Sequence, residues 1–163
     1  MDFYDFNIVE QQSFKIIPEA SLLKVQMSIK SGGYNDPAKG FTDGYATKSL
    51  ASGAIYLACE FTVLDGEYAG YKIWQLIGLY SDKNDNIWGN MGRYLIRSII
   101  NSAKGLKSND DSDLAQTLRK ISSFSQLNSM EFIAKIGIKK DSFGNQKNFI
   151  KKAIGPEHQD YER

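Results

Sequence analysis

Two adjoining alternating segments between Ile55 and Tyr80 constrain the fold of this chain more than any other feature. The segments read IYLACEFTVL and YKIWQLIGLY, and in both of them apolar side chains recur at every second position. That period is typical of β-strands, and the DGEYAG between them has the residue types of a tight turn. The pair therefore predicts two antiparallel strands, with Lys72, Trp74 and Tyr80 on the outward face.

Similar alternation predicts three more strands, at residues 22–30, 130–139 and 148–154. Helical spacing predicts a helix at 88–104, with an apolar stripe through Met91 and Ile99 and an N-cap at Asn90, and a shorter helix at 113–121. Three strands, a helical insertion and two strands form the order of the oligonucleotide-binding (OB) barrel. We expect an α+β fold, an OB-like five-stranded antiparallel barrel with the helical insertion between strands three and four. Other small β-barrels and an α+β sandwich satisfy the same order.

The length of 163 residues predicts a single domain over 1–163, with an N-terminal arm at 1–17, an OB-like core at 18–155 and a charged tail at 156–163. Cys59 is the sole cysteine, which excludes a disulfide within the chain and argues against a thiolate zinc site. The first residues show no secretory signal, and no apolar run is long enough to span a bilayer. We expect a cytoplasmic protein that has no membrane partner.

A glycine-rich stretch at 31–52 predicts a long loop that carries three aromatic residues among lysines. Loops longer than about 15 residues are uncommon in compact domains and are usually functional or disordered. Disordered segments are poor in aromatic residues, so we expect this loop to be ordered, or to be ordered by binding. In an OB barrel, this loop and the one at 141–147 flank the binding face.

Charge is distributed unevenly along the chain. From Arg93 to Lys152 there are twelve basic residues and five acidic ones, a local excess of +7 in a chain whose net charge is +1. A basic field with interleaved aromatic rings suits single-stranded nucleic acid, which is held by stacking and by neutralisation of phosphates. The predicted nucleic-acid-binding residues are Tyr34, Phe41, Tyr45, Lys48, Lys72, Trp74, Tyr80, Lys135, Lys139 and Lys151.

Each of these features also has a purely structural interpretation. Trp74 could pack beneath the helix, the loop aromatics could form a cluster of their own, and the lysines could belong to a solvated surface. Catalysis is not expected, because His158 is the one histidine and lies in the tail, and no glycine-rich phosphate-binding motif is present. The acidic clusters, at 36–43 and 110–113, do not predict a metal site. We therefore expect a protein that is not an enzyme and has no catalytic residue, metal or cofactor.

Six segments resemble a group of phage and prophage proteins of uncharacterised activity. They are VQMSIKSGGY (25–34), DGYAT (43–47), EFTVLDGEYAGYKIW (60–74), NMGRYLIRSIINSAKG (90–105), LNSMEFIAKIGIKKD (127–141) and GPEHQDY (155–161). Together they cover most of the chain. The group resembles proteins encoded beside phage recombination and replication functions, and the resemblance implies action on single-stranded DNA. It supplies no catalytic residues.

These observations predict sequence-tolerant single-stranded DNA binding in phage recombination or replication, in the cytoplasm of the bacterial host cell. The expected partners are single-stranded DNA and a recombinase or a replication protein. Two alternatives remain open at this point. One is a protein–protein adaptor for a phage recombinase or replisome component. The other is a structural homo-oligomer whose sheet edges and N-terminal arm pair between subunits.

Overall fold

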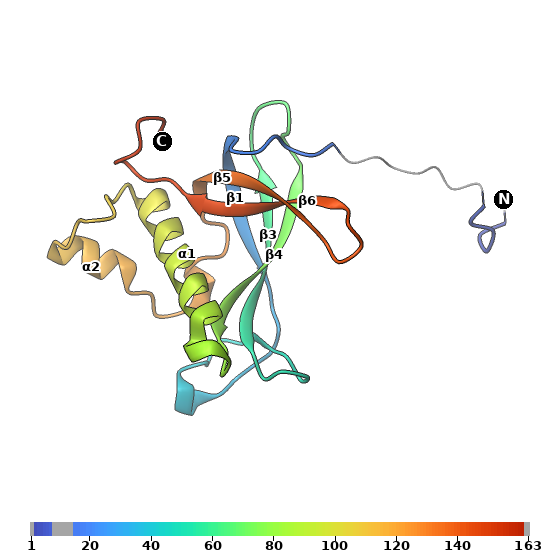
Figure 1. Cartoon of the computed structure of the whole chain (residues 1–163). Helices are drawn as coiled ribbons and strands as arrows, with labels where there is room; N and C mark the ends of the chain where they lie inside the picture. Colours follow the sequence, from blue (N-terminus) through green and yellow to red (C-terminus); the bar gives the residue numbers. More distant parts are fainter. Residues whose placement is uncertain (1, 8–14, 162–163) are drawn as a thin grey trace.

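The computed structural model describes residues 2–7 and 15–161. Its strands are β1 (Leu22–Lys30), β2 (Thr47–Lys48), β3 (Ile55–Val63), β4 (Lys72–Tyr80), β5 (Glu131–Lys140) and β6 (Gln146–Ala153). Its helices are α1 (Ile87–Lys104) and α2 (Asp113–Arg119), with short 3-10 turns η1 (Pro37–Lys39), η2 (Asn84–Asn86) and η3 (Phe124–Gln126). The predicted α+β class is confirmed (Figure 1).

The strands form one sheet in which neighbours pair antiparallel in the order β4, β3, β1, β5, β6, and β2 pairs with the start of β3. Among the described residues no backbone ladder joins β4 to β6, so the sheet is open there. One side chain spans the gap. Gln75 of β4 accepts from the N–H of Ile150 at 2.7 Å and donates to the carbonyl of the same residue at 3.3 Å.

The alternation in β3 produces a buried face and a half-buried face. Every second side chain from Ile55 to Val63 is buried, and the ring of Phe61 meets that of Phe132 edge to face, with centroids 5.8 Å apart. Cys59 lies in this core, where burial raises the pKa of its thiol to about 12. Such a thiol stays protonated at neutral pH, which agrees with its interpretation as a core side chain.

Helix α1 packs against the outer face of β4 where two glycines meet. A Cβ on Gly92 would overlap the carbonyl of Gly78, and a Cβ on Gly78 would lie 2.6 Å from the ring of Trp88. Both glycines therefore allow a helix–strand approach that any side chain would prevent. The helix begins at Ile87, so the predicted N-cap at Asn90 is wrong. Gly89 and Gly92 let the helix lie close to β4 from that earlier start.

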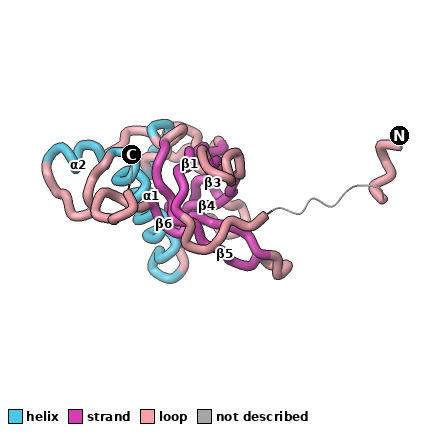
Figure 2. Tube along the Cα trace, turned by 90° about the horizontal axis from the view of Figure 1, so that it is seen from above, coloured by secondary structure: helices cyan, strands magenta, loops and turns pink. Residues whose placement is uncertain are grey.

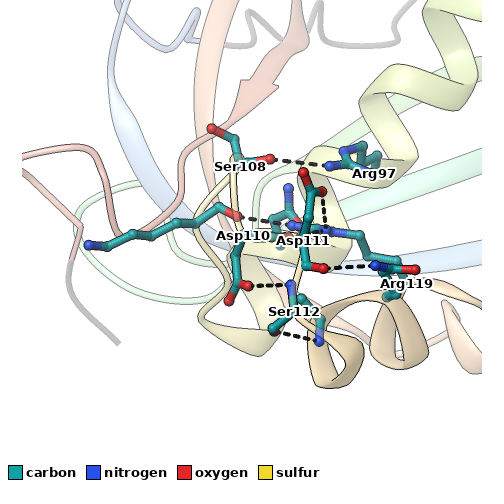
Figure 3. A network of polar contacts seen from close by, with 10 residues as sticks. Arg97, Ser108, Asp110, Asp111, Ser112 and Arg119 are labelled. Atoms are coloured by element: carbon teal, nitrogen blue, oxygen red, sulfur yellow. Dashed lines mark hydrogen bonds and ion pairs between the residues drawn. The ribbon is translucent and has the colours of Figure 1, made fainter.

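Both helices lie to one side of the strands, and α2 is the outer of the two (Figures 1 and 2). Arg119 fixes this arrangement. Its guanidinium donates to the side chain of Asn101 at 2.8 Å and to the carbonyls of Asp110 and Lys107. Arg97 donates to the carbonyl of Ser108 in the same connection (Figure 3). Two arginines of the basic half of the chain are thus engaged in holding the helical insertion together.

Candidate nucleic-acid interface

An open groove of about 980 Å³ lies between the outer face of β4, helix α1 and strand β6. Gln75 and Ile150 line it, so it lies over the gap in the sheet, and we name it the seam groove. Its other principal lining residues are aromatic, apolar or basic. They are Trp74, Leu76, Ile87, Trp88, Met91, Tyr94, Lys139, Lys147, Phe149, Lys151 and Lys152.

Trp74 presents its ring to this groove from the middle of β4. Strand alternation directs it outward, and 66% of its surface is exposed. Glu60, opposite it on β3, accepts from its indole Nε1–H at 3.0 Å and from the ammonium of Lys72 at 2.6 Å. The bond from Lys72 is the main reason why the pKa of Glu60 is lowered. Because an indole donates in its ring plane, this contact holds the edge of Trp74 and leaves the ring face free to stack.

Helix α1 supplies the opposite apolar wall. Ile87, Met91 and Tyr94 follow one another at helical spacing on the same face, and all three are exposed, Tyr94 to 74%. A polar face would be expected where a helix meets water. The exposed stripe is therefore a surface that a ligand with flat or apolar parts could cover.

The β5–β6 hairpin supplies the basic wall. Lys139 stands opposite Lys147 in the ladder, and Lys135 stands opposite Lys152 across a register shift. Among the described residues the structure shows no ion pair for any of these four lysines, and the ammonium of Lys139 lies 5.2 Å from the ring centroid of Phe149. Like charges on one strand face repel, so an anion bound there would be stabilised.

The ten residues predicted from the sequence fall into separate groups. Trp74, Lys139 and Lys151 line the seam groove, although Lys151 also pairs with Glu19 at 3.3 Å. Lys72 lies next to Trp74 and is paired with Glu60, as described above. Lys135 is half-buried, and the register places Lys152 rather than Lys151 opposite it.

The remaining predicted residues gather at the loop between β1 and β3. Tyr34, Phe41 and Tyr45 are half-buried against the core. The rings of Tyr34 and Phe41 are 5.5 Å apart, and Phe41 stacks on Phe124 at 6.3 Å. Lys48 and Lys39 lie over the rings of Tyr34 and Tyr80, at 5.6 and 5.5 Å from their centroids. None of these residues lines the seam groove.

Asp43 anchors the same loop. Its carboxylate accepts from the backbone N–H of Phe124 at 2.7 Å, the hydroxyl of Ser123 at 2.9 Å and the N–H of Tyr45 at 3.1 Å. Burial raises the pKa of Asp43, but these hydrogen bonds outweigh that effect and leave the pKa lowered. Asp43 thus ties the long loop to Ser123 and Phe124 at the start of η3.

Several groove residues were not predicted from the sequence: Leu76, Ile87, Trp88, Met91, Tyr94, Lys147, Phe149 and Lys152. Two signals point toward some of them. The spacing of Ile87, Met91 and Tyr94 marks a second apolar stripe on α1, and Lys147 alternates with Phe149 along β6. No local sequence pattern predicts that α1, β4 and β6 lie side by side.

Within residues 2–7 and 15–161, no group of three or more His, Cys, Asp or Glu side chains is placed to hold a metal ion. In the same part of the chain, no helix is both long and apolar enough to cross a membrane. Comparison with protein-family models, with curated proteins and with solved structures gives no match to this chain.

Proposed function

We propose that this protein binds single-stranded DNA through the seam groove, with little dependence on base sequence. The observation that carries the proposal is that one groove presents the exposed rings of Trp74 and Tyr94 together with lysines that have no ion-pair partner among the described residues. Stacking of a base on an aromatic side chain contributes about 1–3 kcal/mol and tolerates every base, because each base has a π-face. Lysines neutralise the phosphates that connect the stacked bases.

The strand order supports an OB-like barrel as the finer description of the fold. Five strands in the order β4, β3, β1, β5, β6, with β6 beside β4, follow the order of that barrel. Along the chain, α1 falls between β4 and β5, which are the third and fourth of these five strands. The hydrogen bonds of Gln75 take the place of the ladder that would close it. OB-like barrels bind oligonucleotides on the face of their second and third strands, and the seam groove shares the third of these strands, β4, with that face.

The biological setting that we propose is phage recombination or replication in the cytoplasm of a bacterial host. It rests on the resemblance of segments such as EFTVLDGEYAGYKIW to proteins of phages and prophages. The protein would bind DNA without breaking a bond, and a recombinase or a replication protein would act on the bound strand.

A fluorescence titration tests the proposal directly, because both tryptophans of the chain, Trp74 and Trp88, line the groove. We expect oligo-dT to change the tryptophan emission at low salt, and duplex DNA of equal length to bind more weakly. The logarithm of the affinity should fall with the logarithm of salt concentration with a slope of about −0.7 per neutralised phosphate. Unchanged emission and no retention of labelled oligo-dT at low salt would refute the proposal.

A protein–protein adaptor is the second candidate, and the exposed apolar stripe of Ile87, Met91 and Tyr94 on α1 favours it. An amphipathic helix of a partner could lie along that stripe. Because such binding depends mainly on apolar burial, it would weaken little with salt. The salt dependence of binding therefore separates the two candidates.

A further inference from the structure

The N-terminal segment Asp2–Asn7 has a composition complementary to that of the seam groove. Phe3, Tyr4 and Phe6 are exposed to 81%, 91% and 73%, and Asp2 and Asp5 are their neighbours in the sequence. The segment thus presents three rings and two carboxylates to solvent.

Local hydrogen bonds shape this segment. Asp2 accepts from the N–H of Tyr4 at 2.9 Å, and Asp5 accepts from the backbone N–H of Asn7 at 3.0 Å. The bond from Asn7 is the main cause of the lowered pKa of Asp5, so this carboxylate is ionised at neutral pH. The segment is therefore both acidic and aromatic.

The seam groove offers the matching surface. Its β4 and α1 walls expose Trp74 and Tyr94, and its β5–β6 wall carries Lys139, Lys147 and Lys152. Aromatic pairs contribute roughly 0.5–1.5 kcal/mol beyond the area that they bury. Carboxylates from the segment would meet lysines that have no acidic partner among the described residues.

The path of the chain brings the segment within reach of the groove. The backbone N–H and carbonyl of Ile17 both pair with the side chain of Asn148, each at 2.9 Å, and Asn148 lies between Lys147 and Phe149 on β6. The chain therefore meets the folded body at strand β6, on the face opposite to Lys147 and Phe149.

The length of the intervening chain is sufficient. Ten residue steps separate Asn7 from Ile17, and at 3.3–3.6 Å per residue they span at most about 33–36 Å. Helix α1, with 18 residues, is only about 27 Å long. The tether is therefore longer than the helical wall of the groove.

We propose that Asp2–Asn7 docks in the seam groove of its own chain and thereby competes with single-stranded DNA for it. A short tether places a ligand at an effective concentration in the millimolar range, so weak contacts are sufficient for occupancy. The docking itself does not depend on DNA. The competition rests on the function proposed above.

The experiment uses the full chain and a variant, F3A/Y4A/F6A, whose substitutions lie outside the core. We would measure how strongly acrylamide, a neutral quencher, reduces the emission of Trp74 and Trp88. Docking predicts that the quenching constant is about twofold larger in the variant, and that a synthetic peptide of residues 2–7 restores protection. Equal quenching constants in the two proteins would overturn the proposal.

The variant D2N/D5N tests whether the carboxylates of the N-terminal segment contribute to docking. The variant D65N/E67Q, in the turn between β3 and β4, changes the net charge by the same amount and is the control. Removal of the arm carboxylates should raise the quenching constant and increase oligo-dT affinity severalfold, while the control changes neither. Equal effects of both variants would show a general charge effect and overturn the docking. Protection that is lost on dilution would assign the segment to a second copy and overturn the same-chain assignment.

The two proposals fail in different ways. If the arm variants alter quenching but no form of the protein binds oligo-dT, the docking stands and the DNA-binding function is refuted. If oligo-dT binds with equal affinity to the wild type and to F3A/Y4A/F6A, and their quenching constants are equal, the DNA-binding function stands and the docking is refuted.

Discussion

The side chain of Trp74 is held in one orientation while its ring face stays exposed to a ligand. Its indole edge is held by Glu60, which also pairs with Lys72, so the orientation of the ring is set before any ligand arrives. A side chain that is already ordered loses little rotamer freedom on binding. The exposed ring face should therefore contribute its full stacking energy.

Replacement of Trp74 by alanine is expected to weaken oligo-dT binding by roughly 5- to 150-fold, which corresponds to the loss of about 1–3 kcal/mol of stacking. Trp74→Phe keeps a π-face and removes only the hydrogen bond to Glu60, so it should retain most of the affinity. Anisotropy of a labelled oligonucleotide measures both variants. Equal losses in the two would assign the effect to the Glu60 contact and contradict stacking.

For single residues, the sequence predicted the direction in which a strand side chain points, but not which other residues it contacts. Alternation along β4 correctly predicted that Trp74 faces outward. It could not show that Phe41 stacks on Phe124, because that contact joins segments more than 80 residues apart. Which aromatic rings remain exposed depends on the tertiary neighbours of each ring.

Among the elements, the contact of α1 with β4 depends on the absence of two side chains. Gly92 lies against the carbonyl of Gly78, and Trp88 covers Gly78 from the helix. Because β4 and α1 are also two walls of the seam groove, this contact sets the spacing between Trp74 and Tyr94.

The substitution Gly92→Ala should destabilise the fold by about 2–4 kcal/mol, since its methyl group would overlap a backbone atom that cannot move without the strand. Thermal or urea unfolding measures the change. Arg93→Ala, at the neighbouring exposed position, is the control and should stay within about 0.5 kcal/mol of the wild type. Similar stability of the G92A variant and the wild type would contradict the close helix–strand contact.

The β5–β6 hairpin makes a prediction about salt. The triple variant K139Q/K147Q/K152Q should bind oligo-dT more weakly, and its salt slope should become shallower by about 2, at about 0.7 per lysine that meets a phosphate. The variant K104Q/K107Q/K120Q carries the same change in net charge at exposed positions that do not line the groove, and it should keep the wild-type slope. Equal slopes in the two triple variants would show that the hairpin has no special part in binding.

Most element bounds were predictable because alternation and helical spacing are local. The strand at 22–30 has the predicted bounds, and the second helix ends only two residues early, at Arg119. Helix α1 starts one residue before the predicted 88, and only its N-cap was misplaced, because the helix follows three residues with positive φ, at 84–86, that no hydrophobic period marks. Met91, predicted in the core stripe, is exposed in the groove instead.

For the molecule as a whole, the gap between β4 and β6 is the decisive feature. Gln75 satisfies both backbone groups of Ile150 across it. A buried N–H or carbonyl left without a partner costs about 1–3 kcal/mol.

We expect Gln75→Ala to lower the free energy of unfolding by about 1–3 kcal/mol and to accelerate hydrogen exchange at the amide of Ile150. Gln26→Ala is the matched control, since the side chain of Gln26 makes a single, exposed 3.4 Å bond to the carbonyl of Ser129. Unchanged exchange at Ile150 in the Q75A variant would show that the bridge is dispensable.

The order of strands and the helical insertion were predictable at the scale of the molecule, and the class follows from them. The open gap was not, because its closing contact is one glutamine side chain and not a ladder with a strand period. Since the seam groove lies over that gap, Lys147, Phe149 and Lys152 could not be assigned to a site from the sequence.

The bridge made by Gln75 has a mechanical consequence. Two strands held by a ladder move together, whereas β4 and β6 are joined by a pair of hydrogen bonds to one flexible side chain. Slight spreading of these strands would strain that link without breaking a ladder, and the groove above it would widen to admit a purine or narrow around a pyrimidine. The low dependence on base sequence would then arise because the distance between β4 and β6 can adjust to the size of the base.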